Sequence, residues 1–154
     1  MRVVEEKQMM LGEVSIANIT FNQKSRDDID KLLKGLQHLY KNVELREKLF
    51  GVLEKMIPNG IAHDNGRPGM HLWRVFVLGM LRLNLNWDYD RLHNMVNYHS
   101  KIREMLGHPE WDDYVYELQT IKDNFRLFTL EILDEINQIV VLAGHQLLKK
   151  KTVV

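Results

Sequence analysis

The sequence predicts an all-α protein, built as a multi-helix bundle that contains a helix-turn-helix-like pair. Apolar residues recur three or four positions apart over most of the 154 residues, the spacing that places them on one face of a helix. Residues 70–83 are apolar on nearly every face, which is typical of a helix buried among other helices. A short extended stretch is expected near the N-terminus, where polar and β-branched residues, among them Val14, Ile16 and Ile19, follow no helical period.

The first predicted unit is a helical hairpin over residues 26–57. Ser25 and Asp28 fit an acidic variant of the capping box, in which side chains at the first turn satisfy free backbone amides. Asn42 is expected to cap the second helix. Two helically spaced apolar series follow these caps: Ile29, Leu32, Leu36 and Leu39, then Leu45, Leu49, Val52 and Met56.

Residues 58–69 are the clearest predicted linker, because Pro58 and Gly60 break helices for hydrogen-bonding and steric reasons. The sequence therefore predicts three regions along the chain. They are an N-terminal segment with a helical hairpin (1–59), a helix-turn-helix-like core (60–109), and an acidic loop with a C-terminal helix (110–154).

In the second region the sequence predicts a buried helix over residues 70–83 and a turn from Asn84 to Trp87. Asp88 is then expected to cap a second helix that continues to Tyr98. Its inner side is formed by Leu92, Met95 and Val96. Such an arrangement has the form of a helix-turn-helix, with one buried support helix and one exposed reading helix.

In the remaining chain, Ser100 is expected to cap a short helix that ends at Gly107 and Pro109. Residues 110–128 predict an acidic, aromatic loop followed by a short helix, and Thr129 is expected to cap the last helix. That helix carries a heptad-like seam of Leu133, Ile136, Val140, Ala143 and Leu147. Two heptads are fewer than a stable coiled coil needs, so the seam favours packing inside the domain over a dimer contact.

Composition excludes several classes of protein. Hydrophobic residues make up 45% and charged residues 27% of the chain, which is typical of a globular protein. No apolar run approaches the ~20 residues that span a bilayer, and we expect no membrane association. The absence of cysteine excludes disulfides, thiolate zinc sites and cysteine nucleophiles. A cytoplasmic, nucleoid-associated location is expected, since the charged N-terminus is unlike a secretory signal.

The formal net charge is zero, but the charges are unevenly distributed. Residues 60–106 carry six Lys/Arg against four Asp/Glu, and residues 110–136 carry eight acids against two bases. Because DNA binding needs a local basic face and not a basic total, the middle region can supply a modest one. Ordinary solvated surface charge explains the same pattern.

The predicted reading helix carries residue types that recognise DNA. Arg can form two hydrogen bonds with guanine and Asn two with adenine in the major groove. Lys101 and Arg103 suit phosphate contacts. The other candidate DNA-binding residues are Arg67, Arg91, His93, Asn94, Asn97 and Tyr98. A polar solvent face on an ordinary helical hairpin is the alternative interpretation.

Arg67 belongs to Gly66-Arg67-Pro68, which resembles the core of an AT-hook that enters a narrow minor groove. A stiff linker into the next helix explains the same residues. The seven histidines lack metal-ligand spacing and are expected to be scattered over the surface. No catalytic residues, metal site or cofactor are predicted, because no nucleophile–base pair or phosphate loop is present.

Ordered sequence words over nearly the whole chain resemble the N-terminal (InsH-type) domain of insertion-sequence DDE transposases. The most specific are Gly66-Arg67-Pro68-Gly69-Met70, Leu81-Arg82-Leu83, Asp88-Tyr89-Asp90-Arg91-Leu92, Asn97-Tyr98-His99, Leu118-Gln119-Thr120-Ile121-Lys122-Asp123-Asn124 and Ala143-Gly144-His145. The resemblance implies a helical region that binds double-stranded DNA at the terminal inverted repeats and helps to assemble the transposition complex.

In that family a separate catalytic domain follows, in which three acidic residues hold two metal ions. None of those acids has a counterpart in this sequence, so the resemblance implies no enzymatic activity here. The chain is then expected to be a fragment, or the product of a truncated or frameshifted element. The alternative function is a protein–protein module that forms homodimers, or assembles with full-length transposase and inhibits it.

Overall fold

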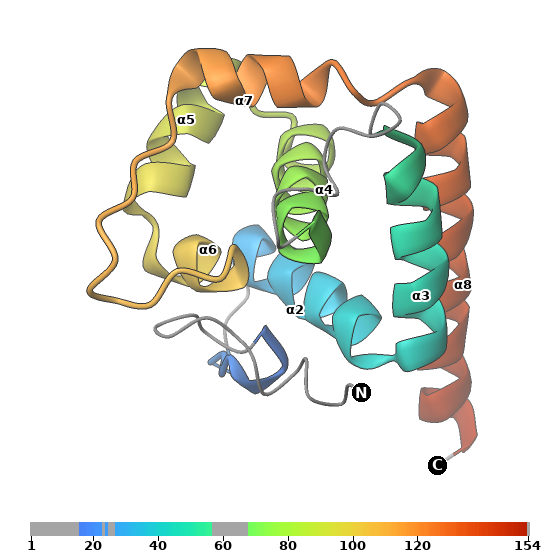
Figure 1. Cartoon of the computed structure of the whole chain (residues 1–154). Coiled ribbons are helices and arrows are strands. Elements are labelled where there is room, and N and C mark those ends of the chain that lie inside the picture. The colour runs from blue at the N-terminus through green and yellow to red at the C-terminus, as the bar shows by residue number, and fades with distance from the viewer. Residues whose placement is uncertain (1–15, 23, 25–26, 57–67, 154) are drawn as a thin grey trace, which may run out of the picture.

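The computed structural model describes residues 16–22, 24, 27–56 and 68–153, with side chains at 68–71 and 144–153 left aside. The described residues form α-helices and short 3-10 turns and contain no strand, so the all-α prediction is confirmed (Figure 1). The elements are η1 (Ile16–Asn18), α2 (Asp28–Lys41), α3 (Val43–Leu53), η2 (Glu54–Met56), α4 (Pro68–Leu85), α5 (Tyr89–Tyr98), α6 (Ser100–Met105), α7 (Leu118–Phe125) and α8 (Leu130–Val153).

Helices α2 and α3 form the predicted hairpin. Asn42 separates them, and its Oδ1 accepts a hydrogen bond from the backbone N–H of Leu45 at 3.1 Å, so the predicted cap is confirmed. At the start of α2 the capping residue is Asp27, which accepts from the N–H of Ile29 at 2.9 Å. The predicted capping box depends on Ser25, which lies outside the described residues.

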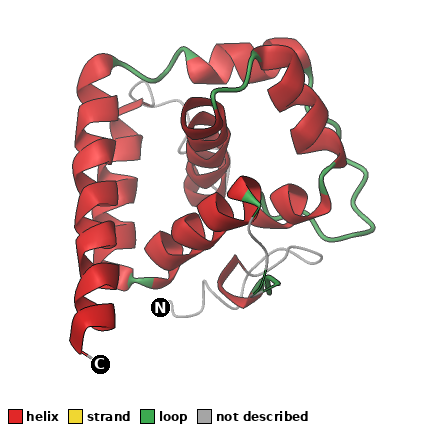
Figure 2. Cartoon of the chain, turned by 180° about the vertical axis from the view of Figure 1, so that it is seen from behind, coloured by secondary structure: helices red, strands yellow, loops and turns green. Residues whose placement is uncertain are grey.

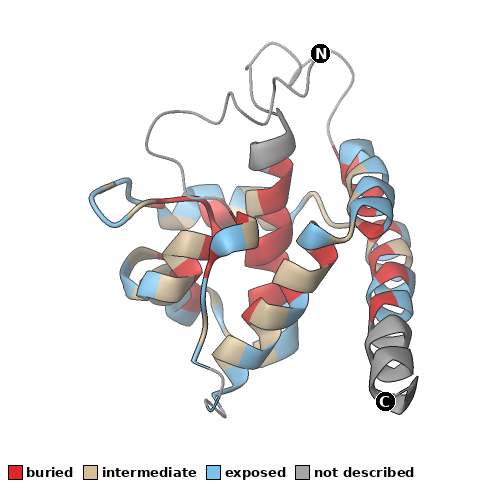
Figure 3. Cartoon of the chain, turned by 90° about the horizontal axis from the view of Figure 1, so that it is seen from below, coloured by how far each residue is buried: buried red, intermediate tan, exposed pale blue. Residues whose placement is uncertain are grey.

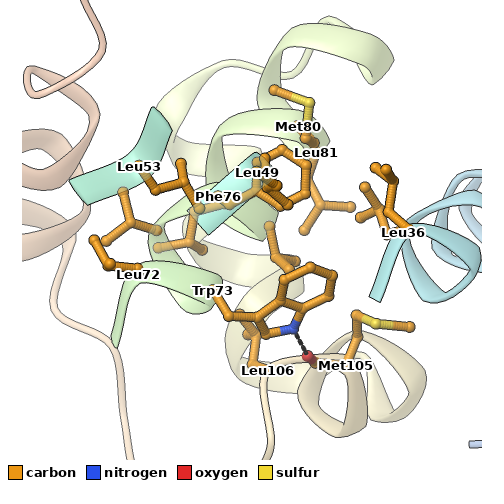
Figure 4. Close-up of a cluster of buried hydrophobic side chains, with 14 of the residues drawn as sticks. Leu36, Leu49, Leu53, Leu72, Trp73, Phe76, Met80, Leu81, Met105 and Leu106 are labelled. Atoms are coloured by element: carbon orange, nitrogen blue, oxygen red, sulfur yellow. Dashed lines mark hydrogen bonds between the residues drawn. The ribbon is translucent and has the colours of Figure 1, made fainter. Parts of the chain in front are cut away.

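Helix α4 runs through the middle of the fold, with α2, α3, α5 and α7 in contact with it (Figure 1). Its predicted burial is confirmed, since Trp73, Phe76 and Leu81 are all 0% exposed. The Trp73 indole N–H donates to the Met105 carbonyl at 2.8 Å, which ties α4 to α6 (Figure 4). A buried indole usually needs such a partner, because an unpaired N–H in an apolar core is unfavourable.

Helix α8 packs lengthwise against α3 (Figures 1 and 2). Thr129 caps it as predicted, accepting from the N–H of Ile132 at 3.1 Å. The predicted seam is shifted, however. Its buried residues are Ile132, Ile136, Ile139 and Ala143, whereas Leu133 and Val140 are partly exposed. Both series satisfy helical spacing, so only the position of α3 selects between them.

Near the N-terminus the predicted extended stretch is wrong within the described residues. Ile16–Asn18 is a 3-10 turn, and Ile16 and Ile19 are both buried. The Gln37 side-chain amide of α2 donates to the Ile16 carbonyl at 3.0 Å and to the Ile19 carbonyl at 2.8 Å. The Gln37 side chain thus supplies hydrogen bonds to these carbonyls that a neighbouring strand would supply to an extended segment. Val14 lies outside the described residues.

One cluster of buried residues joins all three predicted regions. It includes Leu36 from the first region, Phe76 from the second and Ile136 from the third. Figure 3 shows buried positions along the inner sides of the helices and exposed positions around them. The boundary predicted near residue 59 falls in 57–67, outside the described residues. Among the described helices, none combines the length and the apolar composition that a membrane-spanning segment needs.

Candidate nucleic-acid interface

The helix pair α4–α5 is joined by a tight turn over residues 86–88; the turn was predicted from Asn84, but α4 continues to Leu85. Asn86 adopts a left-handed conformation with φ of 56°, and the Trp87 N–H donates to the Arg82 carbonyl at 3.1 Å. This is the hydrogen bond of a Schellman motif, in which asparagine tolerates the positive φ better than most residues. Asp88 then caps α5, accepting from the Arg91 N–H at 2.7 Å, so the predicted cap is confirmed.

The angle between α4 and α5 is held by an aromatic cage around Arg82. The guanidinium carbon of Arg82 lies 4.2 Å from the ring centroid of Tyr89 and 4.7 Å from that of Phe125. Tyr89 and Phe125 are themselves packed edge to face at 6.0 Å. Since these residues come from α4, α5 and α7, the cage joins three helices, and each cation–π contact contributes roughly 0.5–2 kcal/mol. Sequence inspection did not reveal it.

The outer face of α5 carries three of the predicted reading residues. Arg91, Asn94 and Tyr98 are exposed and fall three and four positions apart, so they share one side of the helix. Tyr98 is 79% exposed. The Arg91 guanidinium lies 5.7 Å from the Trp87 ring centroid, a contact that leaves its hydrogen-bond donors available. This face is the candidate reading surface, and the opposite side of α5 packs Leu92 and Val96 into the core, as predicted.

Asn97 does not belong to that face, and the prediction that it reads bases is corrected. Its Oδ1 accepts from the Tyr116 N–H at 2.8 Å, and its Nδ2 donates to the carbonyls of Tyr116 at 3.1 Å and His93 at 2.9 Å. An asparagine amide can pair with a peptide group as it would with adenine, since both present one donor and one acceptor. In this fold the Asn97 amide is already paired with the peptide groups on either side of Tyr116's backbone and is not free to pair with adenine.

Lys101 and Arg103 lie on α6, where contacts within the fold use their charges. The Lys101 ammonium donates to the Thr20 carbonyl and lies 3.3 Å from a Glu104 carboxylate oxygen. Arg103 donates through Nη2 to the Asp112 carbonyl at 3.0 Å. The predicted pair of phosphate contacts is therefore corrected, because both side chains are partly buried and already paired.

The change of direction at His99 explains why α6 does not continue the reading face. His99 interrupts the helix with extended backbone, and its Nδ1 accepts from the Ile102 N–H at 3.3 Å. The prediction that Ser100 caps this helix is therefore wrong by one residue. Gly107, with φ of 94°, lies at the predicted end of the helix. Of the remaining candidates, His93 is half-buried, and Arg67 lies outside the described residues.

A histidine that was expected at the surface is instead buried. His108 is 3% exposed, with Nδ1 2.9 Å from a carboxylate oxygen of Asp112 and Nε2 2.7 Å from the Tyr116 hydroxyl. Burial lowers the pKa of His108, partly opposed by its hydrogen bond to Asp112. The same hydrogen bond lowers the pKa of Asp112, whereas burial raises the pKa of Tyr116. The neutral ring donating to Asp112 and accepting from Tyr116 satisfies all three groups.

This trio resembles a proton relay but joins parts of the fold. Tyr116 is 5% exposed, and its hydroxyl is hydrogen-bonded to the buried His108 ring and not directed to an open cleft. With the Asn97 and Arg103 contacts, His108 fixes residues 106–117 against α5 and α6. The four-residue spacing from His108 to Asp112 to Tyr116 was visible in the sequence, but burial was not. Among described residues, no group of three or more His, Asp or Glu is placed to hold a metal ion.

Electrostatics around the reading surface are mixed. Asp88 and Asp90 are exposed beside Arg91 at the first turn of α5. Asp88 helps to stabilise the helix N-terminus, but both carboxylates reduce the attraction of this surface for phosphate. Compared with family models, curated proteins and solved structures, the chain has no significant match.

Proposed function

We propose that this chain is the DNA-binding and assembly region of an insertion-sequence DDE transposase, and that it recognises the terminal inverted repeats without catalysis of its own. The sequence resemblance suggests the class of protein. The observation that carries the proposal is the exposed row of Arg91, Asn94 and Tyr98 on a helix supported by α4 and α7.

The chemistry of this row suits a major groove. Arg91 can donate two hydrogen bonds to guanine, and Asn94 can pair with adenine through its amide. Tyr98 lies one turn further along α5 and can donate its hydroxyl to a backbone phosphate. The Arg82 cage limits rotation of α5 against α4, so DNA binding should cost little conformational entropy in this helix pair.

Lys101 and Arg103 are engaged inside the fold, so neither of the two charges predicted to contact phosphates is left free for DNA. Each phosphate that is neutralised contributes roughly −0.9 to the slope of log affinity against log salt. We therefore expect a shallow slope for this chain, no steeper than about −3.

The test starts with selection of bound duplexes from a random DNA library, followed by titration of the selected duplex and a scrambled one. Arg91→Ala should weaken binding to the selected duplex by roughly 5–150-fold and reduce discrimination between the two. Arg126→Ala is the matched control, because its side chain is 73% exposed and it lies at the C-terminal end of α7 and not on α5. It should change both affinities slightly and equally.

Two results would reject this reading surface. One is a selection that enriches no duplex. The other is an equal effect of Arg91→Ala and Arg126→Ala on the selected sequence.

A protein–protein module is the second candidate function. The observation in its favour is a run of three consecutive apolar residues on α8, Val140, Val141 and Leu142, which are 38–47% exposed; Val140 lies beside α2 and Leu142 beside α3. Exposed apolar groups in a row are typical of interaction surfaces. Under this proposal a short chain would dimerise, or join full-length transposase and inhibit it. Cross-linking that Val141→Asp abolishes, with DNA binding unchanged, would support it over the first.

A further inference from the structure

The segment between α6 and α7 presents large apolar side chains to solvent. Trp111 is 72% exposed, Tyr114 50% and Val115 59%. We call these three residues, with the exposed carboxylates of Glu110, Asp113 and Glu117, the acidic aromatic loop. An exposed tryptophan beside an exposed tyrosine is uncommon on a surface that contacts only water, and both residue types are enriched at interaction sites.

The acidic aromatic loop is held in one conformation although it has no regular secondary structure. Its backbone is fixed by the pairing of Tyr116 with Asn97 and of Asp112 with Arg103. The Tyr114 ring stacks on the buried His108 ring with centroids 5.5 Å apart and planes 13° apart. Tyr114 also packs edge to face with Tyr116 at 4.9 Å, and it remains 50% exposed. A rigid aromatic surface binds with little loss of side-chain entropy.

The charge of the loop selects the kind of partner. Residues 110–117 hold four acids and no base. This surface repels nucleic-acid phosphates, and it attracts a protein segment that combines cationic and apolar side chains. Lysine and arginine stems also cover aromatic rings while their charges reach neighbouring carboxylates.

The chain itself contains a segment of this composition. Residues 144–154 hold Leu147, Leu148 and then Lys149-Lys150-Lys151, with no acid. The C-terminal end of α8 and the loop between α6 and α7 lie on opposite sides of the fold in Figures 1 and 2. The two cannot meet within one chain. They can meet between two chains, in a head-to-tail contact.

We propose that the acidic aromatic loop binds the Leu147–Lys151 region of a second copy of this chain. Trp111 and Tyr114 would cover the leucines and the lysine stems, and Glu110, Asp113 and Glu117 would pair with the ammonium groups. This inference does not depend on DNA binding. It supplies an assembly contact that uses neither the reading surface of α5 nor the exposed row on α8 at residues 140–142.

The experiment is sedimentation velocity of the full chain without DNA over a wide concentration range, in 50 mM and 500 mM salt. We expect reversible association that weakens several-fold in high salt, because exposed charge pairs are screened. Trp111→Ala should weaken it by about tenfold or more, as truncation of a central aromatic residue does. Leu130→Ala is the matched control, since Leu130 is 87% exposed and lies at the other end of α8.

A charge exchange tests the pairing directly. The triple variant E110K/D113K/E117K and the triple variant K149E/K150E/K151E should each be monomeric, with circular dichroism confirming that both stay helical. Their equimolar mixture should associate, because opposite charges then face each other again.

Three results would overturn the proposal. The first is a wild-type chain that is monomeric at every concentration. The second is association that Val141→Asp abolishes and Trp111→Ala leaves unchanged. The third is a mixture of the two folded triple variants that remains monomeric.

Discussion

Asn97 and Asn94 are three residues apart on α5, and the structure gives them different tasks. Asn97 pairs with the backbone of the loop that precedes α7, and Asn94 is exposed and makes no side-chain hydrogen bond within the described chain. Replacing each with alanine removes the same atoms from the same helix. The comparison therefore isolates the hydrogen bonds of Asn97 from the effect of the substitution itself.

The expected magnitude follows from those hydrogen bonds. Asn97 takes part in three, at 2.8, 2.9 and 3.1 Å, and each contributes about 1 kcal/mol net. Alanine regains roughly 0.6 kcal/mol of helix propensity at either site. Asn97→Ala should therefore lower the free energy of unfolding by about 2 kcal/mol, and Asn94→Ala should raise it by roughly 0.5 kcal/mol.

Urea denaturation followed by circular dichroism at 222 nm measures both values through a linear extrapolation. Hydrogen exchange at the Tyr116 amide gives a local readout, since this N–H should lose protection only in the Asn97 variant. Stabilities of the two variants within about 0.5 kcal/mol of each other, the lower limit for a single hydrogen bond, would refute the structural role of Asn97. The loop would then be held by other contacts.

Three further perturbations test the core and the buried histidine. Because the pKa of His108 is lowered in the folded state, the unfolded chain binds more protons, and the free energy of unfolding should be full above about pH 6.5 and decrease as the pH falls below it. Urea titrations at several pH values should show this decrease, and His108→Phe should reduce it. Gly79→Ala should lower the free energy of unfolding by about 1–2 kcal/mol despite better helix propensity, because the new Cβ would lie 2.6 Å from Phe128 Cζ. The same substitution in a Phe128→Leu background should cost much less, and equal losses in both backgrounds would contradict the clash. Trp73→Phe should lower the free energy of unfolding by about 2–3 kcal/mol, since it removes the donor to the Met105 carbonyl and leaves a void. A melting temperature within about 2 °C of wild type corresponds to a loss of well under about 1 kcal/mol and would contradict this.

Much of the helical framework was predictable because its signals are local. The caps at Asn42, Asp88 and Thr129 were found from residue type and the apolar spacing that follows. The burial of α4 was predicted from its composition, since a helix with apolar residues on every side has no face suited to water.

The candidate reading surface was predictable only in part. Helical periodicity placed Arg91, Asn94 and Tyr98 together on an exposed side of α5. It could not show that Asn97 pairs with Tyr116, which lies nineteen residues further along the chain. A polar side chain on the rim of a helix can face solvent or another segment, and the sequence leaves both open.

The sequence by itself determined which segments are helical, where three of the described helices start, and which helix lies at the centre, because these properties arise from interactions within a few residues. Only the tertiary structure decided which side of α8 is buried, since Ile132, Ile136 and Ile139 are selected by the position of α3. It also decided the roles of His108 and Lys101, whose partners belong to other segments. Burial and long-range hydrogen bonds depend on the arrangement of the whole chain, and periodicity carries no information about them.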